Sequence, residues 1–140
     1  MPKPTRSLYF ENSAGRLWEE PESYLRLQYH SGPREVAQFR ALLTHTGHAL
    51  SRRQWSRVLV DQRAMEPYSP TEQQWMSTEW LPRAVHEGGY RYGAIMVAHN
   101  VFARLAMTQL ALSTRDLPHT YRTFEGEDEA LAWLLAQGRR

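Results

Sequence analysis

The stretch that most constrains the fold is Trp-Ser-Arg-Val-Leu-Val-Asp, residues 55–61, whose apolar run stops abruptly at Asp61. Consecutive apolar residues in a strand face both sides of a sheet, because neighbouring side chains point to opposite faces. A strand that is apolar on both faces is typical of the centre of a sheet covered by helices. The stretch therefore predicts an α/β fold in which Asp61, Gln62 and Arg63 follow the carboxyl end of a central strand.

Before this stretch, the sequence predicts an antiparallel meander. Residues 7–20 read as two short strands around an Asn-Ser-Ala-Gly turn, in which Gly15 is available for a positive φ angle. The next run, residues 24–30, alternates apolar and polar residues, with Leu25 and Leu27 on one face, which is typical of a half-buried strand.

The rest of the chain alternates between helical and strand periodicity. We expect a helix with Pro33 at its first position. The later elements expected are a helix after Ser69, a strand over 92–98, a helix from Asn100, a strand over 120–124 and a helix over 127–138. This order predicts an α/β domain whose mixed sheet begins with the antiparallel meander and continues with parallel strands joined by helices. We expect one domain over residues 1–140, with residues 1–7 as a flexible N-terminal arm.

Composition narrows the classes of function. The chain has no cysteine, which excludes disulfides and thiolate metal sites. Its formal charge is only +2 and no basic block exceeds two residues, so we expect no nucleic-acid partner. No signal-peptide pattern and no membrane-length apolar run occurs, so we expect a cytoplasmic protein without a membrane span. No motif for nucleotide hydrolysis, dinucleotide binding or hydrolase chemistry occurs, and we expect no cofactor.

Two histidines of the first expected helix have a spacing that can place two imidazoles on one metal ion. They are His45 and His48. No carboxylate joins them in a metalloprotease-type spacing, and no His-Glu-x-x-His motif occurs. We therefore expect no metal site, but one histidine at the surface and one partly buried.

Candidate site residues come from the rule that open α/β sheets bind ligands beyond the carboxyl ends of their parallel strands. This rule nominates Asp61, Arg63, His99 and His30, which follow expected strands and could converge on one rim. There, an aspartate near a histidine could perform acid–base catalysis, and Arg63 could hold an anion. The structural alternative, which we favour, is that Asp61 shapes its turn by accepting loop hydrogen bonds or pairing with a local arginine.

The second expected helix has a clear start. Ser69 to Glu72 form a capping box, in which the serine and glutamate side chains bind each other's backbone amides. Phosphorylation of Ser69 is the functional alternative, because a phosphate is electrostatically favoured at a helix N-terminus. Trp75 and Trp80 share one side of this helix and predict core packing, and Pro82 predicts a kink one turn before it.

Three motifs carry a family resemblance. They are Leu-Val-Asp-Gln-Arg at 59–63, Glu-Trp-Leu-Pro-Arg-Ala at 79–84 and Ala-Leu-Ala-Trp-Leu at 130–134. With them, the chain resembles a STAS-like family of small bacterial domains, distant relatives of anti-sigma-factor antagonists. The resemblance implies a mixed sheet with helices largely on one side. In the antagonists a partner kinase phosphorylates a serine at a helix N-terminus. Ser69 takes the comparable place, with Tyr-Ser-Pro-Thr-Glu in place of the family's Asp-Ser signature.

Three functions follow as hypotheses. The leading one is a non-catalytic regulatory or protein-interaction domain that binds a partner, or itself, through the loop from Asp61 to Ser69, with Tyr68 exposed. The alternative is a small-ligand-binding protein or enzyme with its site at the carboxyl rim of the sheet, around Asp61, Arg63 and His99. A third is a carrier of an apolar ligand, which needs a sizeable cavity beneath the helices.

Overall fold

The computed structural model describes residues 5–138, and six strands form one sheet whose spatial order equals the order along the chain. The strands are β1 (Ser7–Glu11), β2 (Gly15–Glu20), β3 (Tyr24–Tyr29), β4 (Arg57–Asp61), β5 (Tyr92–Met96) and β6 (Thr120–Phe124). The helices are α1 (Val36–Arg53), α2 (Pro70–Trp75), the π-helical η1 (Met76–Trp80), α3 (Leu81–His86), α4 (Val101–Ser113) and α5 (Glu127–Leu135).

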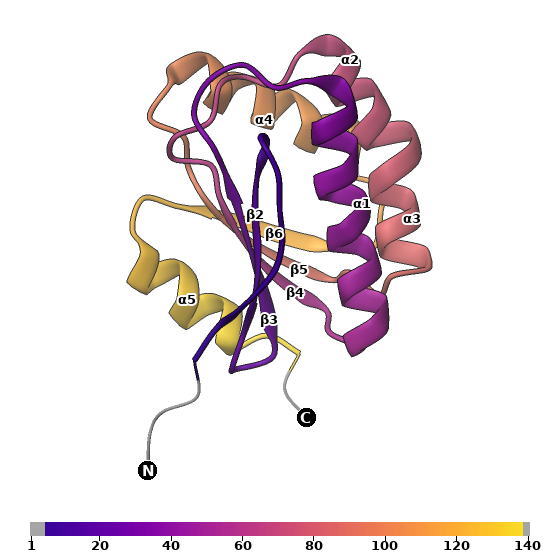
Figure 1. Ribbon diagram of the computed structural model, residues 1–140, viewed down its shortest axis with the longest axis vertical. Coiled ribbons are helices and arrows are strands. Elements are labelled where there is room, and N and C mark those ends of the chain that lie inside the picture. The colour runs from indigo at the N-terminus through magenta and orange to yellow at the C-terminus, as the bar shows by residue number, and fades with distance from the viewer. Residues whose placement is uncertain (1–4, 139–140) are drawn as a thin grey trace.

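The sheet is mixed, and the predicted α/β class is confirmed. β1, β2 and β3 pair antiparallel, whereas β3, β4, β5 and β6 pair parallel. Each parallel pair is joined by a helical crossover, as parallel neighbours require. Figure 1 shows the long α1 and α3 side by side along the sheet, with α4 across one end.

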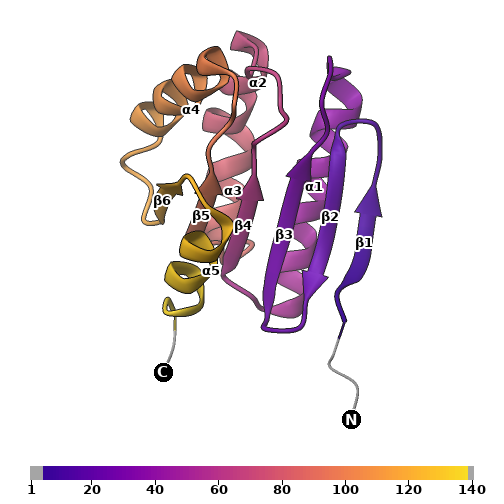
Figure 2. The ribbon, with the colours of Figure 1, turned by 90° about the vertical axis from the view of Figure 1, so that its left-hand side faces the viewer.

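The helices cover the two faces of the sheet unequally. α1, α2, η1, α3 and α4 pack on one face, into which Val58 and Val60 of β4 point. α5 packs on the other face, where Leu59 of the same strand contacts the cluster around Ala130 and Leu134. Figure 2 shows α5 on the opposite side of the sheet from α1 and α3. β4 is therefore apolar on both faces because helices cover both.

The expected starts of α2 and α4 are confirmed. Ser69 caps α2 as predicted, and α4 begins after Asn100, where the Oδ1 of Asn100 accepts from the backbone N–H of Phe102 at 2.8 Å. The expectation that Pro33 begins α1 is wrong, because α1 begins at Val36 after an extended Glu35. Residues 33–35 thus form an extended connection before α1. The side chain of Arg34 in this connection reaches α2.

Pro82 is accommodated by a π-helical turn. α2, η1 and α3 follow one another without a break, and η1 ends just before the proline. Pro82 has no backbone N–H to donate to the preceding turn, so that turn widens. The disturbance therefore lies where the sequence predicts a kink.

Gly15 serves close packing instead of a turn. The expectation of a positive φ angle there is wrong, because the glycines with positive φ are Gly32, Gly89 and Gly138. Gly15 begins β2, and a Cβ atom at this position would overlap the carbonyl oxygen of Gln28 on β3. The close approach of two strands therefore requires a residue without a side chain.

The ends of the chain add two observations. The expected flexible arm over residues 1–7 lies partly outside the described residues, and Ser7 already belongs to β1. Within residues 5–138, no helix combines the length and the apolar character needed to cross a membrane.

Candidate functional site

Asp61 ends β4 and is held by its own turn. Its side chain is buried, and Arg63 donates to it twice, from Nε to Oδ1 at 3.0 Å and from Nη2 to Oδ2 at 2.9 Å. The backbone N–H of Arg63 adds a third hydrogen bond to Oδ1, at 3.1 Å. Both carboxylate oxygens are therefore engaged within the turn.

Two further charges complete a network between the sheet and α5. Arg26 Nη2 lies 2.8 Å from Glu127 Oε1 and 3.9 Å from Asp61 Oδ2. Burial alone would raise the pKa of Asp61, but the hydrogen bonds of Arg63 and the charge of Arg26 outweigh burial and hold the pKa below its usual value. A carboxylate kept ionised by two arginines is a weak proton acceptor, which favours the structural role of Asp61 over general-base catalysis.

Neither rim histidine joins this network through its side chain. The His99 side chain is exposed, and its backbone N–H donates to the Arg63 carbonyl at 3.1 Å. His30 pairs instead with β1, where its Nε2 lies 3.3 Å from Glu11 Oε2. Among residues 5–138, no hydrogen bond joins either imidazole to Asp61. The rim thus brings Asp61 and Arg63 together without a histidine.

The two helical histidines behave as the sequence predicts. His45 is partly buried and stacks on Phe10, with ring centroids 4.0 Å apart, while His48 is exposed. The part of the chain that the structure describes contains no group of three or more His, Asp or Glu side chains placed to hold a metal ion.

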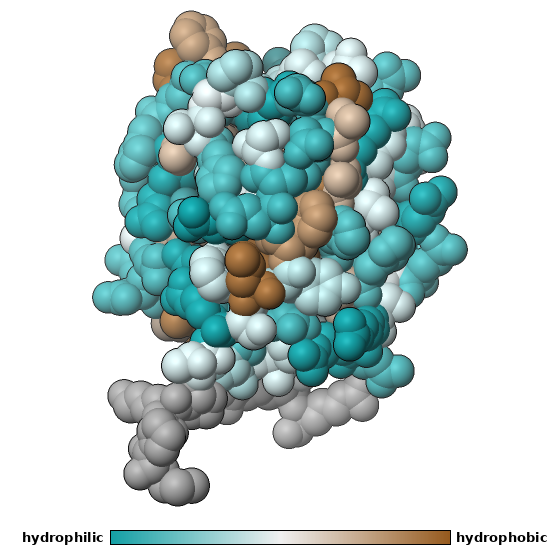
Figure 3. Space-filling model, viewed as in Figure 1, coloured by the Kyte–Doolittle hydropathy of each residue, from teal (hydrophilic) through white to brown (hydrophobic). Residues whose placement is uncertain are grey.

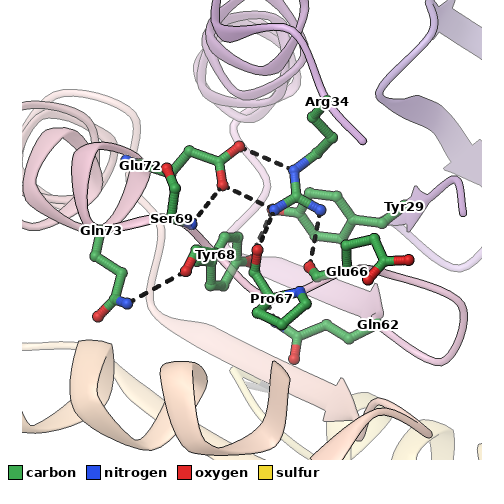
Figure 4. Close-up of polar contacts among 9 residues, drawn as sticks. All are labelled: Tyr29, Arg34, Gln62, Glu66, Pro67, Tyr68, Ser69, Glu72 and Gln73. Carbon is green, nitrogen blue, oxygen red and sulfur yellow. Dashed lines mark hydrogen bonds and ion pairs between the residues drawn. The ribbon is translucent and has the colours of Figure 1, made fainter. Parts of the chain in front are cut away.

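Arg34 fixes the loop from Asp61 to Ser69 from inside the protein (Figure 4). Its side chain is 3% exposed and donates to Glu72, from Nε to Oε2 at 2.9 Å and from Nη2 to Oε1 at 2.8 Å. It also donates to the carbonyls of Glu66 and Pro67, at 2.9 and 3.0 Å. One buried guanidinium therefore ties the segment before α1 to the loop and to α2.

Tyr68 lies inside the protein, and the expectation that it is exposed is wrong. It is 4% exposed, its hydroxyl donates to the Tyr29 hydroxyl at 2.9 Å, and it accepts from Gln62 Nε2 at 3.2 Å. The Arg34 guanidinium lies 5.6 Å from the centre of its ring, within cation–π range. Burial raises the pKa of Tyr68 to about 12, so the hydroxyl stays neutral. The aromatic ring therefore belongs to the core beneath the loop.

Ser69 is exposed, and the predicted capping box is confirmed. Its Oγ accepts from the Glu72 N–H at 3.1 Å, and its own N–H donates to Glu72 Oε1 at 2.8 Å. Phosphorylation of Ser69 stays a prediction. Binding of a ligand or partner also stays a prediction for the five candidates, Asp61, Arg63, Tyr68, Ser69 and His99.

α4 is apolar on both sides, but the protein covers only one. Its inner side buries Ala103, Ala106 and Leu110 against the core. Of the seven large apolar side chains exposed among the described residues, four lie on its outer side. They are Val101 (66% exposed), Phe102 (69%), Leu105 (56%) and Leu112 (62%), which we call the α4 patch.

Three residues of the α4 patch lie along one stripe of the helix. Val101, Leu105 and Leu112 follow helical spacing, with the polar Thr108 between Leu105 and Leu112, and Phe102 lies about 100° around the helix from Val101. Figure 3 shows a mainly hydrophilic face, with apolar residues at the upper left, where Figure 1 shows α4, and others across the middle. Among the described elements, α4 has the most exposed large apolar side chains.

A cavity of about 50 Å³ lies beneath the helices, between the sheet, η1 and α4. Apolar side chains such as Val60, Ile95 and Leu110 form most of its wall, and Gln62, Tyr90 and His119 are among its polar residues. The volume is far below the several hundred Å³ of typical ligand pockets, so it does not suit a carrier of large apolar ligands.

Sequence reasoning missed Arg34 and the α4 patch for different reasons. Arg34 binds Glu72, which lies 38 positions further along the chain. No local sequence pattern indicates a contact between residues so far apart. The patch has a visible signal, because Val-Phe-Ala-Arg-Leu-Ala-Met-Thr-Gln-Leu-Ala-Leu-Ser, residues 101–113, contains one charged residue. A helix that is apolar all round predicts cover on both sides.

No protein-family model matches this chain, and comparison with curated proteins and with solved structures finds no similar protein.

Proposed function

We propose that this protein is a non-catalytic interaction domain that binds another protein surface through the α4 patch. The observation that carries the proposal is a helix that buries one apolar side and exposes four large apolar side chains on the other. Single exposed apolar residues are ordinary on soluble proteins, whereas a contiguous patch on one element marks an interaction site. A partner with a complementary apolar strip would bury Leu105, which lies between Val101 and Leu112 along the helix.

The proposal moves the binding surface away from the loop between Asp61 and Ser69. The groups of this loop that were expected to reach a partner are engaged internally, since Tyr68 is buried and Asp61 is held by Arg63. The same engagement makes the alternative, a small-ligand site or enzyme around Asp61, Arg63 and His99, the weaker reading. By contrast, no other described element covers the apolar side chains of the α4 patch.

A regulatory role, a STAS-like relationship and a cytoplasmic location belong to the same proposal. A mixed sheet whose helices lie mainly on one face supports the relationship. The binding partner is either a second copy of the chain or another protein, and both would present an apolar surface to α4.

The proposal is tested by comparing tagged wild type with Leu105→Glu in pull-downs, together with light scattering of each purified protein. Burying an apolar side chain of this size contributes about 1.5–3 kcal/mol, and a buried unpaired carboxylate opposes binding further. We expect Leu105→Glu to abolish self-association or to remove specific partners that wild type retains.

The matched control is Val36→Glu, because Val36 is a single exposed apolar residue at the start of α1, outside the α4 patch. It should behave as wild type. Equal binding by wild type and Leu105→Glu, or equal loss in both variants, would contradict a role for the α4 patch.

A further inference from the structure

The cavity beneath α4 contains a tyrosine hydroxyl without a partner. Tyr90 is 6% exposed and lines the cavity. Its hydroxyl lies over Gly93 of β5, where a Cβ atom would overlap it. Burial raises the pKa of Tyr90 well above its usual value, so the group is a neutral donor and acceptor. Buried tyrosine hydroxyls normally have a partner. Within residues 5–138, the Tyr90 hydroxyl has no hydrogen-bond partner, and it is not fully enclosed, so a small molecule in the cavity can reach it.

Two more polar groups on the cavity wall have spare hydrogen-bonding capacity. His119 Nδ1 is buried and lacks a hydrogen bond to any described residue. Burial lowers the pKa of His119, the Leu117 backbone opposes this, and the charge of Arg91 lowers the pKa further, so the pKa lies below its usual value and the neutral imidazole is favoured. Gln62 donates through Nε2 to Tyr68, which leaves its carbonyl oxygen available. The apolar cavity therefore contains several groups that a polar atom would satisfy.

An open groove of about 370 Å³ adjoins the cavity, between α4 and β6. Ala111, Thr114, His119 and Tyr121 line both spaces, so a passage between them would run past these four residues. Arg115 lines the groove, is exposed, and makes no ion pair with any residue of the described chain. A positive charge thus lies outside the passage, and polar groups lie inside it.

We propose that the cavity and the groove form one binding site for a small amphipathic acid. Its apolar, single-ring body carries a hydroxyl at one end and a carboxylate at the other. The hydroxyl enters the cavity and bonds with Tyr90, the ring lies in the passage beside Tyr121, and the carboxylate pairs with Arg115. The cavity has room for only a few water-sized groups. Met107 is partly buried and flexible, so it moves aside to admit the ring.

The test uses three probes and purified protein without a partner, so it can fail or succeed separately from the pull-down test, although Leu112 of the α4 patch also lines the groove. The probes are para-hydroxyphenylpropionate, phenylpropionate (which lacks the hydroxyl) and para-cresol (which lacks the carboxylate). Calorimetric titration and the rise in melting temperature both report binding to the folded protein. We expect saturable binding of the first probe, and binding of the other two that is about three- to tenfold weaker.

Three variants assign the contacts. Tyr90→Phe should remove the preference for para-hydroxyphenylpropionate over phenylpropionate, and Arg115→Met should remove the preference over para-cresol. Ala111→Leu should block the passage and weaken all three probes. Arg83→Met, an exposed arginine on α3, should bind as wild type. Circular dichroism of each variant verifies folding.

Two results would overturn the proposal. One is the absence of saturable binding of para-hydroxyphenylpropionate to folded wild type, which would leave a cavity that holds only water. The other is binding that Ala111→Leu leaves unchanged, or preferences that survive both Tyr90→Phe and Arg115→Met, because the probe would then lie elsewhere.

Discussion

Replacing Arg34 with methionine is expected to unlock the loop from Asp61 to Ser69. The Glu72 side chain, only 8% exposed, would lose both guanidinium hydrogen bonds, and the carbonyls of Glu66 and Pro67 would lose theirs. Removing one partner of a buried ion pair typically costs about 3–5 kcal/mol, because the other charge stays buried and uncompensated. We expect a loss of this size in the free energy of unfolding.

The assay is urea unfolding followed by tryptophan fluorescence. With a denaturant dependence of about 2 kcal/mol per molar urea, the midpoint should fall by about 2 M. The double variant Arg34→Met/Glu72→Gln should recover part of the loss, because glutamine keeps the capping box and removes the uncompensated charge. The control is Arg83→Met, whose ion pair with Glu87 is exposed, and it should change stability by about 0.5 kcal/mol or less. A midpoint for Arg34→Met that equals that of Arg83→Met would refute this reasoning.

Three other substitutions have definite expected outcomes. Gly93→Ala should destabilise by about 1–3 kcal/mol through overlap with the Tyr90 hydroxyl, and adding Tyr90→Phe should restore most of the loss in thermal unfolding; no restoration would mean that the overlap is not the cause. Asp61 has a folded pKa below its unfolded value, so its carboxylate contributes stability above the unfolded pKa, and that contribution is lost as pH falls through the folded pKa. Asp61→Asn should therefore lower stability near pH 7 and flatten the acid-induced loss below about pH 4 in urea titrations, whereas an unchanged slope would argue against the Arg63 pairing. Ser69→Ala should cost about 1 kcal/mol of unfolding free energy and Ser69→Asp much less, because aspartate also caps helices; equal losses would contradict the cap.

The order of elements could be predicted from the sequence because each element has a local signal. The apolar run of β4 needs helices on both faces, and the box from Ser69 to Glu72 marks the start of α2. The start of α1 was predicted three residues too early, because Pro33 suits a first helical turn as well as the extended connection that it occupies.

The candidate site was less predictable, because its contacts join distant segments. The strand-end rule correctly placed Asp61 and Arg63 together. It could not reveal that the two side chains form hydrogen bonds with each other. Tyr68 reads as a loop residue between prolines, and only the distant Arg34 and Tyr29 make it part of the core. A polar group without a hydrogen-bond partner, such as the Tyr90 hydroxyl, can be recognised only from the positions of the surrounding side chains.

The most direct test of the interaction proposal is photo-crosslinking from within the α4 patch. A photoreactive amino acid replaces Thr108, which is exposed between Leu105 and Leu112, and a second protein carries it at Arg83 as a control. After irradiation of the native cells, we expect a discrete protein adduct at Thr108, with twice the chain mass if the partner is a second copy, and none at Arg83. An absence of adducts at Thr108, or the same adducts at both positions, would contradict the central claim.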